Sequence, residues 1–227
     1  MKAMILAAGR GERMRPLTDH TPKPLLKAAG NPVIKYTLEQ LVSAGFDEIV
    51  INLAHLGAQI RQYFGNGQAF GATIAYSDEG DSALETAGGI IKALPLLGNA
   101  PFLVVNGDVA CDFPLAALHG KTVDLAHLVM INNPAHHSGG DFHLNDRGLL
   151  SESGEPKYTF SGIGVYHPDL FAGLSVTPLK LRPLFNQAML EGRISGEYYQ
   201  GFWMDIGTPE RLNELSDYYQ QRGHDNA

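Results

Sequence analysis

A run of small residues, glycines and arginines near the start of the chain has the composition of a phosphate-binding loop. It reads LAAGRGERMRPLT over residues 6–18 and is followed by Pro22-Lys23-Pro24. Small residues directly after a strand let the backbone approach a ligand, and successive backbone N–H groups can form a concave anion site. Arg13 and Lys23 are the cations that would neutralise phosphate oxygens. The alternative is an ordinary tight turn with solvated cations, which Gly-x-Gly alone would favour.

Two other glycine-rich phosphate motifs do not fit this run. Met14 stands at the third glycine of Gly-x-Gly-x-x-Gly, and the second expected strand ends in Asn52-Leu-Ala-His rather than in an acid that would bind a ribose. No Gly-x-x-x-x-Gly-Lys-Ser/Thr segment occurs in the chain. A dinucleotide-dependent oxidoreductase is therefore a poor fit, and a Walker loop is excluded.

Two aspartates from distant parts of the chain are candidate metal ligands. Asp108 follows an apolar run in VNGD, and Asp205 follows Trp203 in WMDIGTP. Mg²⁺ prefers hard oxygen ligands and commonly takes one or two carboxylates together with phosphates and water. For each aspartate alone, a turn residue or helix cap is an equal alternative. The paired histidines 136–137, with His143 nearby, are more typical of a solvated loop than of a metal site.

The elements that must position these residues alternate between strand and helix in the first half. Apolar runs predict strands at 2–8, 47–54, 72–77 and 101–106, and periodic apolar stretches predict helices at 32–44, 57–64 and 86–97. This order implies parallel strands joined by right-handed crossovers. The second half predicts strands at 123–132, 142–144 and 158–166 and helices at 178–190 and 209–221. Thr177 and Thr208 are the expected N-caps of the last two helices.

Length and composition fit one large α/β domain. The chain has 227 residues, of which 44% are hydrophobic and 18% charged. We expect a single domain over 1–227 with a Rossmann-like, doubly wound mixed sheet. Its nucleotide-binding half would span about 1–110 and its substrate-binding half about 111–227.

Charge and cysteine usage exclude several classes. Seventeen Lys and Arg against 24 Asp and Glu give a net charge of −7, which argues against nucleic acid or an anionic membrane as a partner. The single cysteine, Cys111, excludes a disulfide framework within the chain and is expected to be a small core thiol. No apolar run approaches the ~18 residues that span a bilayer. No signal peptide is evident, so a reducing cytoplasm is the expected location.

Four motifs, taken in order, resemble those of the sugar-1-phosphate nucleotidylyltransferases. The first run is similar to their LAAGxGTRLxPLT…KP, LETAGG at 84–89 to LGTAGA, VNGD at 105–108 to their GD, and WMDIGTP at 203–209 to WxDIGTP. Glu12 replaces a usual threonine and Glu85 a usual glycine. The resemblance implies the nucleotide-diphospho-sugar transferase fold. It also implies a reaction in which an NTP and a sugar 1-phosphate give a nucleotide sugar and pyrophosphate.

Among short members of that family, the chain is most similar to those that join UTP to N-acetylmuramate 1-phosphate in cell-wall sugar recycling. The similarity lies in its compact length and in its SGGDFHL, YTFSGIGVYHP and WMDIGTPERL segments. Mannose-1-phosphate guanylylation and phosphocholine cytidylylation are alternatives within the same chemistry, and a non-catalytic sugar-nucleotide sensor is one from another class. Small molecules are the expected partners, and the sequence leaves the oligomeric state open.

The resemblance implies a role for each matching position. Arg13 and Lys23 would be catalytic, and Asp108 and Asp205 would hold Mg²⁺. The residues implied for the nucleotide are Ala8, Gly9, Gly11, Glu12, Arg13, Lys23, Glu79, Thr86, Gly88 and Gly107, with Glu85 as an alternative to Glu79 at the base. The residues implied for the sugar are Gly140, Asp141, Lys157 and Gly162.

The sugar-binding half departs from the family at one lysine. Many relatives carry Glu-Lys-Pro, whose lysine binds the sugar phosphate, whereas this chain reads SESGEPKYTFSG with Lys157 displaced. Either Lys157 moves in, or the metal and Lys23 take its place. The lactyl carboxylate of muramate also needs a cation or backbone N–H groups. Lys157, Lys180, Arg182, Arg193 and the segment 137–141 all remain candidates.

Overall fold

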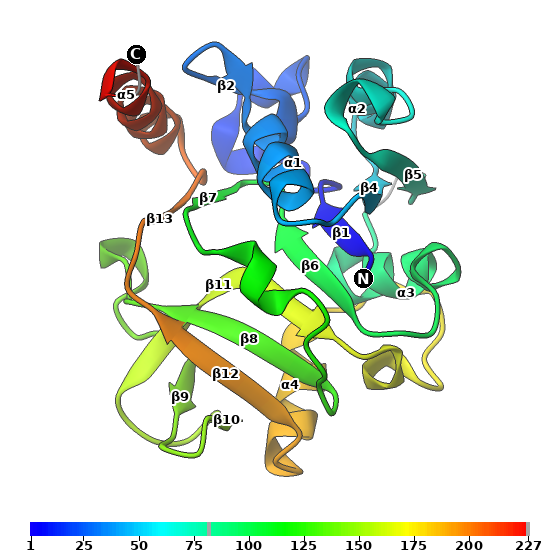
Figure 1. The fold of residues 1–227 in the computed structure, drawn as a ribbon, viewed down its shortest axis with the longest axis vertical. Coiled ribbons are helices and arrows are strands. Elements are labelled where there is room, and N and C mark those ends of the chain that lie inside the picture. Colours follow the sequence, from blue (N-terminus) through cyan, green and yellow to red (C-terminus); the bar gives the residue numbers. More distant parts are fainter. Residues whose placement is uncertain (81–82, 226–227) are drawn as a thin grey trace.

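A mixed β-sheet with helices on both faces forms the centre of the molecule (Figure 1). The computed structural model describes residues 1–80 and 83–225, and within them nine strands belong to this sheet. These strands are β1 (Ala3–Leu6), β4 (Glu48–Leu53), β5 (Thr73–Asp78), β6 (Phe102–Asn106), β8 (Ala126–Ile131), β9 (Phe142–Leu144), β10 (Leu150–Ser151), β11 (Lys157–Tyr166) and β12 (Ile194–Tyr199).

The strand pairing confirms the expected doubly wound mixed sheet. In the first half, β1 lies between β4 and β6 and is parallel to both, and β4 is parallel to β5. In the second half, β11 runs antiparallel to β6 and β8, and β12 runs parallel to β8. Because parallel strands all end at the same edge, the loops after β1, β4 and β6 meet there.

Alternation along the strands divides the core between the two faces of the sheet. Ala3 and Ile5 face the helices α1 (Val33–Ser43) and α2 (Gly57–Phe64), in one apolar cluster. Met4 faces the opposite way, toward α3 (Glu85–Leu97) and α4 (Leu181–Leu190). These β1 residues are fully buried, as expected of a strand that is covered on both faces.

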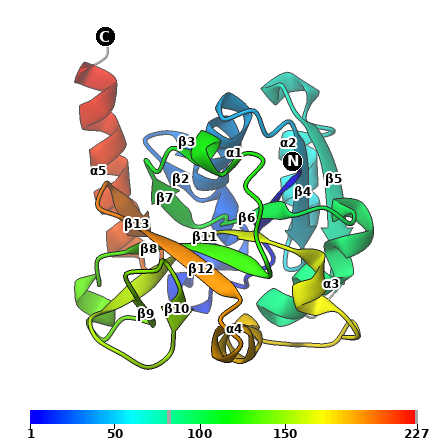
Figure 2. The same cartoon turned by 60° about the horizontal axis from the view of Figure 1, so that its bottom comes forward.

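The last helix, α5 (Pro209–Asp225), lies to one side of the sheet (Figures 1 and 2). Its ring of Tyr219 stacks on that of Tyr36 with centroids 3.9 Å apart. Beside it are two small two-stranded sheets, β2 (Lys27–Ala28) with β3 (Asn31–Pro32) and β7 (Val109–Cys111) with β13 (Trp203–Asp205). No helix in residues 1–80 and 83–225 is both long and apolar enough to cross a membrane.

Most predicted elements are confirmed, and the differences arise from contacts with segments far away in the sequence. The Thr208 cap is confirmed, since its hydroxyl accepts from the backbone N–H of Arg211 at 3.4 Å. The Thr177 cap is wrong, because α4 begins only at Leu181. Residue 179 is instead bound to α3: its N–H donates to the Leu84 carbonyl at 3.0 Å, and its carbonyl accepts from Ala87 at 2.9 Å. The strands β7, β12 and β13 were not predicted, since their pairing is with distant segments.

Candidate active site

The loop after β1 forms one wall of a pocket at the carboxyl edge of the parallel strands. Gly11 adopts φ +70°, and its carbonyl accepts a hydrogen bond from the Thr18 hydroxyl at 2.9 Å. A Cβ added to Gly11 would lie 3.0 Å from the Thr18 methyl, so this glycine is required by the turn. A Cβ added to Gly9 would meet no protein atom within 4 Å, which leaves that backbone open to a ligand.

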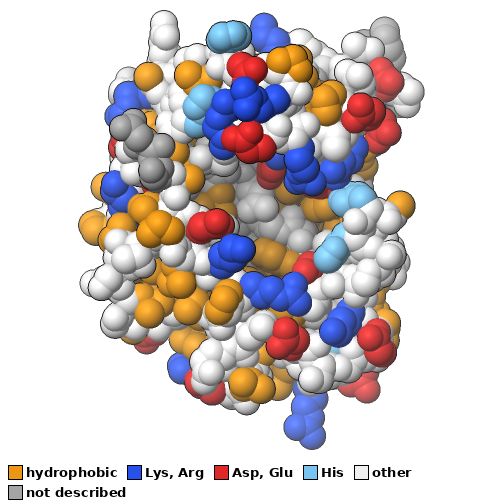
Figure 3. Space-filling view, turned by 180° about the vertical axis from the view of Figure 1, so that it is seen from behind, with side chains coloured by type: hydrophobic (Ala, Val, Ile, Leu, Met, Phe, Trp, Pro, Cys, Tyr) orange, Lys and Arg blue, Asp and Glu red, His pale blue; other side chains and the backbone are white. Residues whose placement is uncertain are grey.

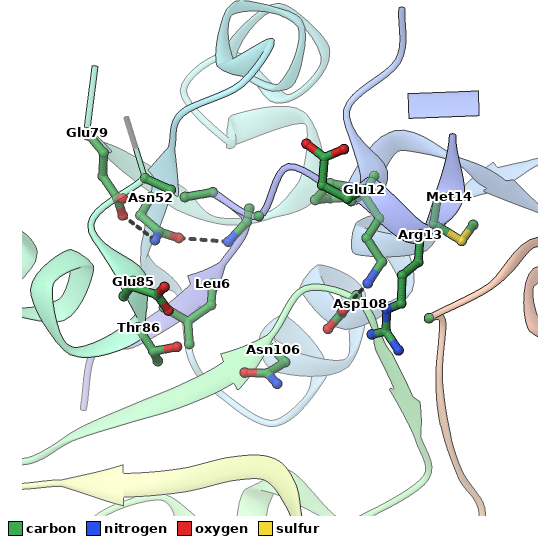
Figure 4. A pocket seen from close by; sticks show the side chains of 18 residues that line it. Leu6, Glu12, Arg13, Met14, Asn52, Glu79, Glu85, Thr86, Asn106 and Asp108 are labelled. Carbon is green, nitrogen blue, oxygen red and sulfur yellow. Dashed lines mark hydrogen bonds and ion pairs between the residues drawn. The ribbon is translucent and has the colours of Figure 1, made fainter. Parts of the chain in front are cut away.

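The pocket has a volume of about 450 Å³ and draws its lining from many segments of the chain. Glu79, Asn52, Glu85 and Thr86 lie on one side of it, and Glu12, Arg13 and Asp108 on the other (Figure 4). Eight of the residues expected to bind the nucleotide line this pocket: Ala8, Gly9, Gly11, Glu12, Arg13, Lys23, Glu79 and Thr86. Their gathering agrees with the expected arrangement, and their contacts with a ligand remain predictions.

A buried polar chain supports the Glu79 side of the pocket (Figure 4). The Asn52 amide donates to Glu79 Oε1 at 2.7 Å and its oxygen accepts from the Ala7 N–H at 2.7 Å. Glu79 Oε2 accepts from the Leu84 N–H at 2.7 Å. Both oxygens of Glu79 are therefore engaged by protein groups, which favours a role in positioning the loops after β1 and β5.

The expected catalytic lysine and one expected metal ligand form an ion pair. The Lys23 ammonium donates to Asp108 Oδ2, although the two residues lie 85 positions apart. Lys23 belongs to a short 3₁₀ turn (Lys23–Leu25), and Asp108 follows β6. Their side chains are 12% and 33% exposed, so the lysine is held below the carboxylate, which reaches toward solvent. A cation and an anion thus occupy adjacent places on one pocket wall.

Asp205 is brought beside Asp108 by the pairing of β7 with β13. In that pair Asp205 lies opposite Val109, and the Ile206 N–H donates to the Asp108 carbonyl at 2.8 Å. The Asp205 carboxylate forms an ion pair with Arg211 and lies 3.2 Å from His136 Nε2. Asp205 is not part of the pocket lining, whereas its neighbour Gly207 is.

These two aspartates fit a hard divalent cation better than a structural metal. Both offer carboxylate oxygens, the ligand type that Mg²⁺ prefers, and each is held in place by an ion pair with a cationic side chain. Among the residues that the structure describes, no group of three or more His, Cys, Asp and Glu side chains forms a metal cluster. Two carboxylates alone leave the remaining coordination positions to phosphate and water, as Mg²⁺ prefers.

Two expected nucleotide ligands lie outside the lining and have structural reasons to be glycine. The Gly107 N–H donates to the Leu6 carbonyl at 2.9 Å, and an added Cβ would lie 2.8 Å from the same oxygen. A Cβ on Gly88 would lie 2.2 Å from the Thr177 carbonyl, because the segment before α4 packs there. Both glycines permit close packing, and a direct contact with the nucleotide remains a prediction for each.

The structure adds residues that the sequence reasoning passed over. Asn52 and Asn106 line the pocket, and each is a polar residue at or near the carboxyl end of a buried parallel strand. That position is itself a signal of a ligand site in α/β proteins. Glu85 adopts φ +58°, a conformation in which L side chains are strained. A glycine, which the resembling family usually has at this position, would adopt the same conformation without strain.

A second pocket of about 340 Å³ adjoins the first and shares with it Glu85, Thr86 and Asn106. Of the residues expected at the sugar, Asp141 lines it, whereas Gly140, Lys157 and Gly162 do not. Gly162 packs against Asn106, since an added Cβ would lie 2.6 Å from the amide nitrogen of that residue. Figure 3 shows a face of the molecule that is hollowed at its centre, with Lys and Arg side chains above and below the hollow.

The chain matches a protein-family model described as "Nucleotidyl transferase" over residues 2–139. It is 52% identical over 222 residues to the N-acetylmuramate alpha-1-phosphate uridylyltransferase of Neisseria meningitidis serogroup B, covering 94% of this chain and 96% of that protein. It is 34% identical over 223 residues to the Caulobacter vibrioides protein of the same name, covering 92% of each.

A solved structure of similar fold is that of a putative glucose-1-phosphate thymidylyltransferase from Bacillus anthracis in complex with a sucrose. The TM-score is 0.84 at 24% sequence identity, and the match covers 96% of this chain and 94% of the other. At this identity the likeness bears on the fold, which is the one the sequence motifs implied.

Proposed function

Because the chain belongs to the nucleotidyl transferase family, we propose that it transfers the uridylyl group of UTP to N-acetylmuramate 1-phosphate, giving the nucleotide sugar and pyrophosphate. The choice of base and sugar is supported by the names of the Neisseria and Caulobacter relatives, which match nearly the whole chain. The proposed setting is the recycling of cell-wall sugars in the cytoplasm, with small molecules as the partners.

The observation that carries the transfer reaction is the junction of two pockets. A bisubstrate transfer requires the two reacting groups to be held side by side. The first pocket has a glycine-rich, arginine-bearing wall suited to a triphosphate, and the second shares three residues with it. We therefore assign the nucleotide to the first pocket and the sugar to the second, with the two phosphates meeting near Asn106.

The chain's own residues would act by position and charge. In the proposed step a sugar-phosphate oxygen forms a bond to the α-phosphorus of UTP, while the bond from that phosphorus to the β-phosphate oxygen breaks. The electron pair leaves with pyrophosphate. A phosphate monoester is already a nucleophile, so no general base is required. Lys23 would balance charge that develops on the α-phosphate, and Arg13 would bind the departing phosphates.

Mg²⁺ is the proposed metal, held by Asp108 and Asp205. When bound, it would supply a positive charge that neutralises phosphate oxygens of both substrates. The Ile206–Asp108 backbone hydrogen bond keeps the two aspartate-bearing segments together. Lys23 and Arg211 hold the two carboxylates in place as their ion-pair partners.

The test is a substrate panel with pyrophosphate release as the signal. Each of UTP, GTP, CTP and ATP is combined with N-acetylmuramate 1-phosphate, N-acetylglucosamine 1-phosphate, glucose 1-phosphate and mannose 1-phosphate in the presence of Mg²⁺. The proposal expects the highest kcat/KM for UTP with N-acetylmuramate 1-phosphate. If kcat/KM were highest for GTP with mannose 1-phosphate, the proposed substrates would be wrong and the proposed reaction type would stand. No pyrophosphate in any combination, with nucleotide binding intact, would favour a sugar-nucleotide sensor.

A further inference from the structure

The second pocket lies where the proposed function places the sugar, and its charged residues differ in whether they have partners. Phe142, Phe160 and Phe185 are among its lining residues and give it apolar surface, which suits the face of a sugar ring. Its charged lining residues besides the shared Glu85 are Asp141, Lys180 and Arg182. Which of these charges is free to meet a ligand decides what the pocket selects.

Asp141 and Arg182 already satisfy one another. Arg182 Nη1 donates to Asp141 Oδ1 at 3.1 Å, and His137 Nε2 lies 3.2 Å from the same oxygen. The other oxygen, Oδ2, accepts from the backbone N–H of Phe160 at 2.9 Å. The Arg182 guanidinium also lies over the Phe142 ring, 5.1 Å from its centroid. This pair therefore shapes the pocket wall and leaves little unbalanced charge.

Lys180 is different, because its ammonium forms no ion pair or hydrogen bond with any side chain in residues 1–80 or 83–222. Its side chain is exposed and lines the pocket. Its backbone is nevertheless well anchored. The preceding residue, Leu179, is bound to the start of α3 by hydrogen bonds with Leu84, Ala87 and Gly88. The residue that follows Lys180, Leu181, is the first residue of α4. An unpaired cation is thus carried into the pocket lining by an anchored stretch of backbone, next to the helix that carries Thr86.

The other cations of this half are less suitable. Arg193 is held by Asp124, with a shortest contact of 2.7 Å, and by Glu191 at 3.6 Å, and it lies outside the pocket lining. Lys157 begins β11 opposite His143 of β9 and also lies outside the lining. Among the four cations that the sequence left open, the structure singles out Lys180, and of the segment 137–141 only Asp141 lines the pocket.

We infer that Lys180 is a specificity-determining residue whose ammonium pairs with the carboxylate that an acidic sugar 1-phosphate carries on its ring. The inference rests on the proposed function and narrows it. The lactyl ether of muramate adds one carboxylate that N-acetylglucosamine and glucose lack. Because the charge of Arg182 is already taken up by Asp141, a carboxylate that enters the pocket needs another cation to offset its desolvation. Lys180 is the cation available for that purpose.

A sugar 1-phosphate has a second anion, its phosphate, and Lys180 could meet that group instead. The two possible contacts of Lys180 predict different effects of the sugar on kcat/KM. A contact with the phosphate would serve every sugar 1-phosphate equally, whereas a contact with the carboxylate would serve the acidic sugar alone. Comparing several sugars therefore distinguishes a contact with the carboxylate from a contact with the phosphate. Comparing variants on one sugar alone would not.

The experiment measures kcat/KM with UTP for N-acetylmuramate 1-phosphate, N-acetylglucosamine 1-phosphate and glucose 1-phosphate. It uses the wild type, Lys180→Gln, Lys180→Arg and a matched control, Lys27→Gln. Lys27 is an exposed lysine of β2 that lines neither pocket. Lys180→Gln should lose about tenfold to a hundredfold with the muramate substrate and little with the other two, since charged hydrogen bonds have this magnitude. Lys180→Arg should retain part of the preference, and Lys27→Gln all of it.

Equal losses of kcat/KM on all three sugars would assign Lys180 to the phosphate and overturn the inference. Unchanged kcat/KM on all three sugars would also overturn it. Calorimetric titration of each protein with N-acetylmuramate 1-phosphate and N-acetylglucosamine 1-phosphate separates this result from failure of the proposed function. If the protein bound N-acetylmuramate 1-phosphate more tightly through Lys180 but released no pyrophosphate, the proposed reaction would be wrong and the inference about Lys180 would stand. Equal binding of the two sugars by the wild type would overturn the inference whatever the turnover.

Discussion

Lys23 and Asp108 form an ion pair across 85 positions of sequence, on the wall of a pocket that both residues line. The two side chains have proposed partners of opposite charge, since the lysine would bind a phosphate and the aspartate a metal ion. Their contact means that a change at either residue also alters the charge that surrounds the other. The first two predictions concern these two residues.

Lys23→Ala should lower kcat by roughly 10²–10³-fold, the loss expected when one donor that acts on the transition state is removed. Because this interaction strengthens as charge develops on the α-phosphate, KM for UTP should change much less than kcat. Steady-state kinetics with pyrophosphate detection measure both constants. A large rise in KM with an unchanged kcat would place Lys23 in ground-state binding only.

Removal of the metal should abolish turnover, and removal of either carboxylate should do so without unfolding the protein. EDTA is added to the wild type, and Asp108→Asn and Asp205→Asn are assayed over a range of Mg²⁺ concentrations. Asp124→Asn is the matched control, since Asp124 is an exposed carboxylate that pairs with Arg193 far along the chain. Full activity in EDTA, or Mg²⁺ dependence in Asp205→Asn equal to that of the wild type, would contradict the two-carboxylate site.

Arg13→Ala should raise KM for UTP by about tenfold to a hundredfold, because a charged hydrogen bond to phosphate is lost. Arg15→Ala provides a control that removes the same charge two positions further along. Arg15 is exposed, lies outside the pocket lining, and pairs with Glu12 at 3.7 Å and Asp19 at 2.8 Å. Its KM should stay within about twofold of the wild type. Equal effects of the two substitutions would reduce the role of Arg13 to general attraction of the nucleotide.

Glu85→Gly should stabilise the fold by roughly 1 kcal/mol, because the left-handed backbone at this position costs an L residue about that much. Glu85→Ala keeps the strain and removes only the carboxylate, so it should show no such gain. Urea denaturation of the three proteins measures the difference. If both variants changed the free energy of unfolding equally, the effect would belong to the side chain and not to the backbone.

Cys111 should be unreactive toward thiol reagents at neutral pH. Burial raises the pKa of its thiol to about 12, so very little of the reactive thiolate exists at pH 7. The rate of modification should be far slower than in urea and should rise as the pH approaches 10 and above. Rapid modification of the folded protein at pH 7 would show that this part of β7 opens readily.

The sequence by itself determined the local elements and the chemistry of the first pocket. The strands at β1, β4, β5 and β6 and the helix at 57–64 follow from apolar runs and periodicity, which are local properties. The glycines and cations around Gly11, Arg13 and Lys23 were likewise recognisable, because a phosphate-binding loop is contiguous in sequence. The motif order also indicated the fold and the reaction class that the family match shows.

Tertiary structure alone decided which distant residues meet. The pairing of β7 with β13 places Asp205 beside Asp108, and the contact of Leu179 with α3 delays the start of α4 and sets Lys180 in a pocket lining. Four cations in the second half were equivalent in sequence, and ion-pair partners from other elements distinguish them. The physical reason is that strand register and ion pairing depend on segments far apart along the chain, whose contacts form only when the whole core packs.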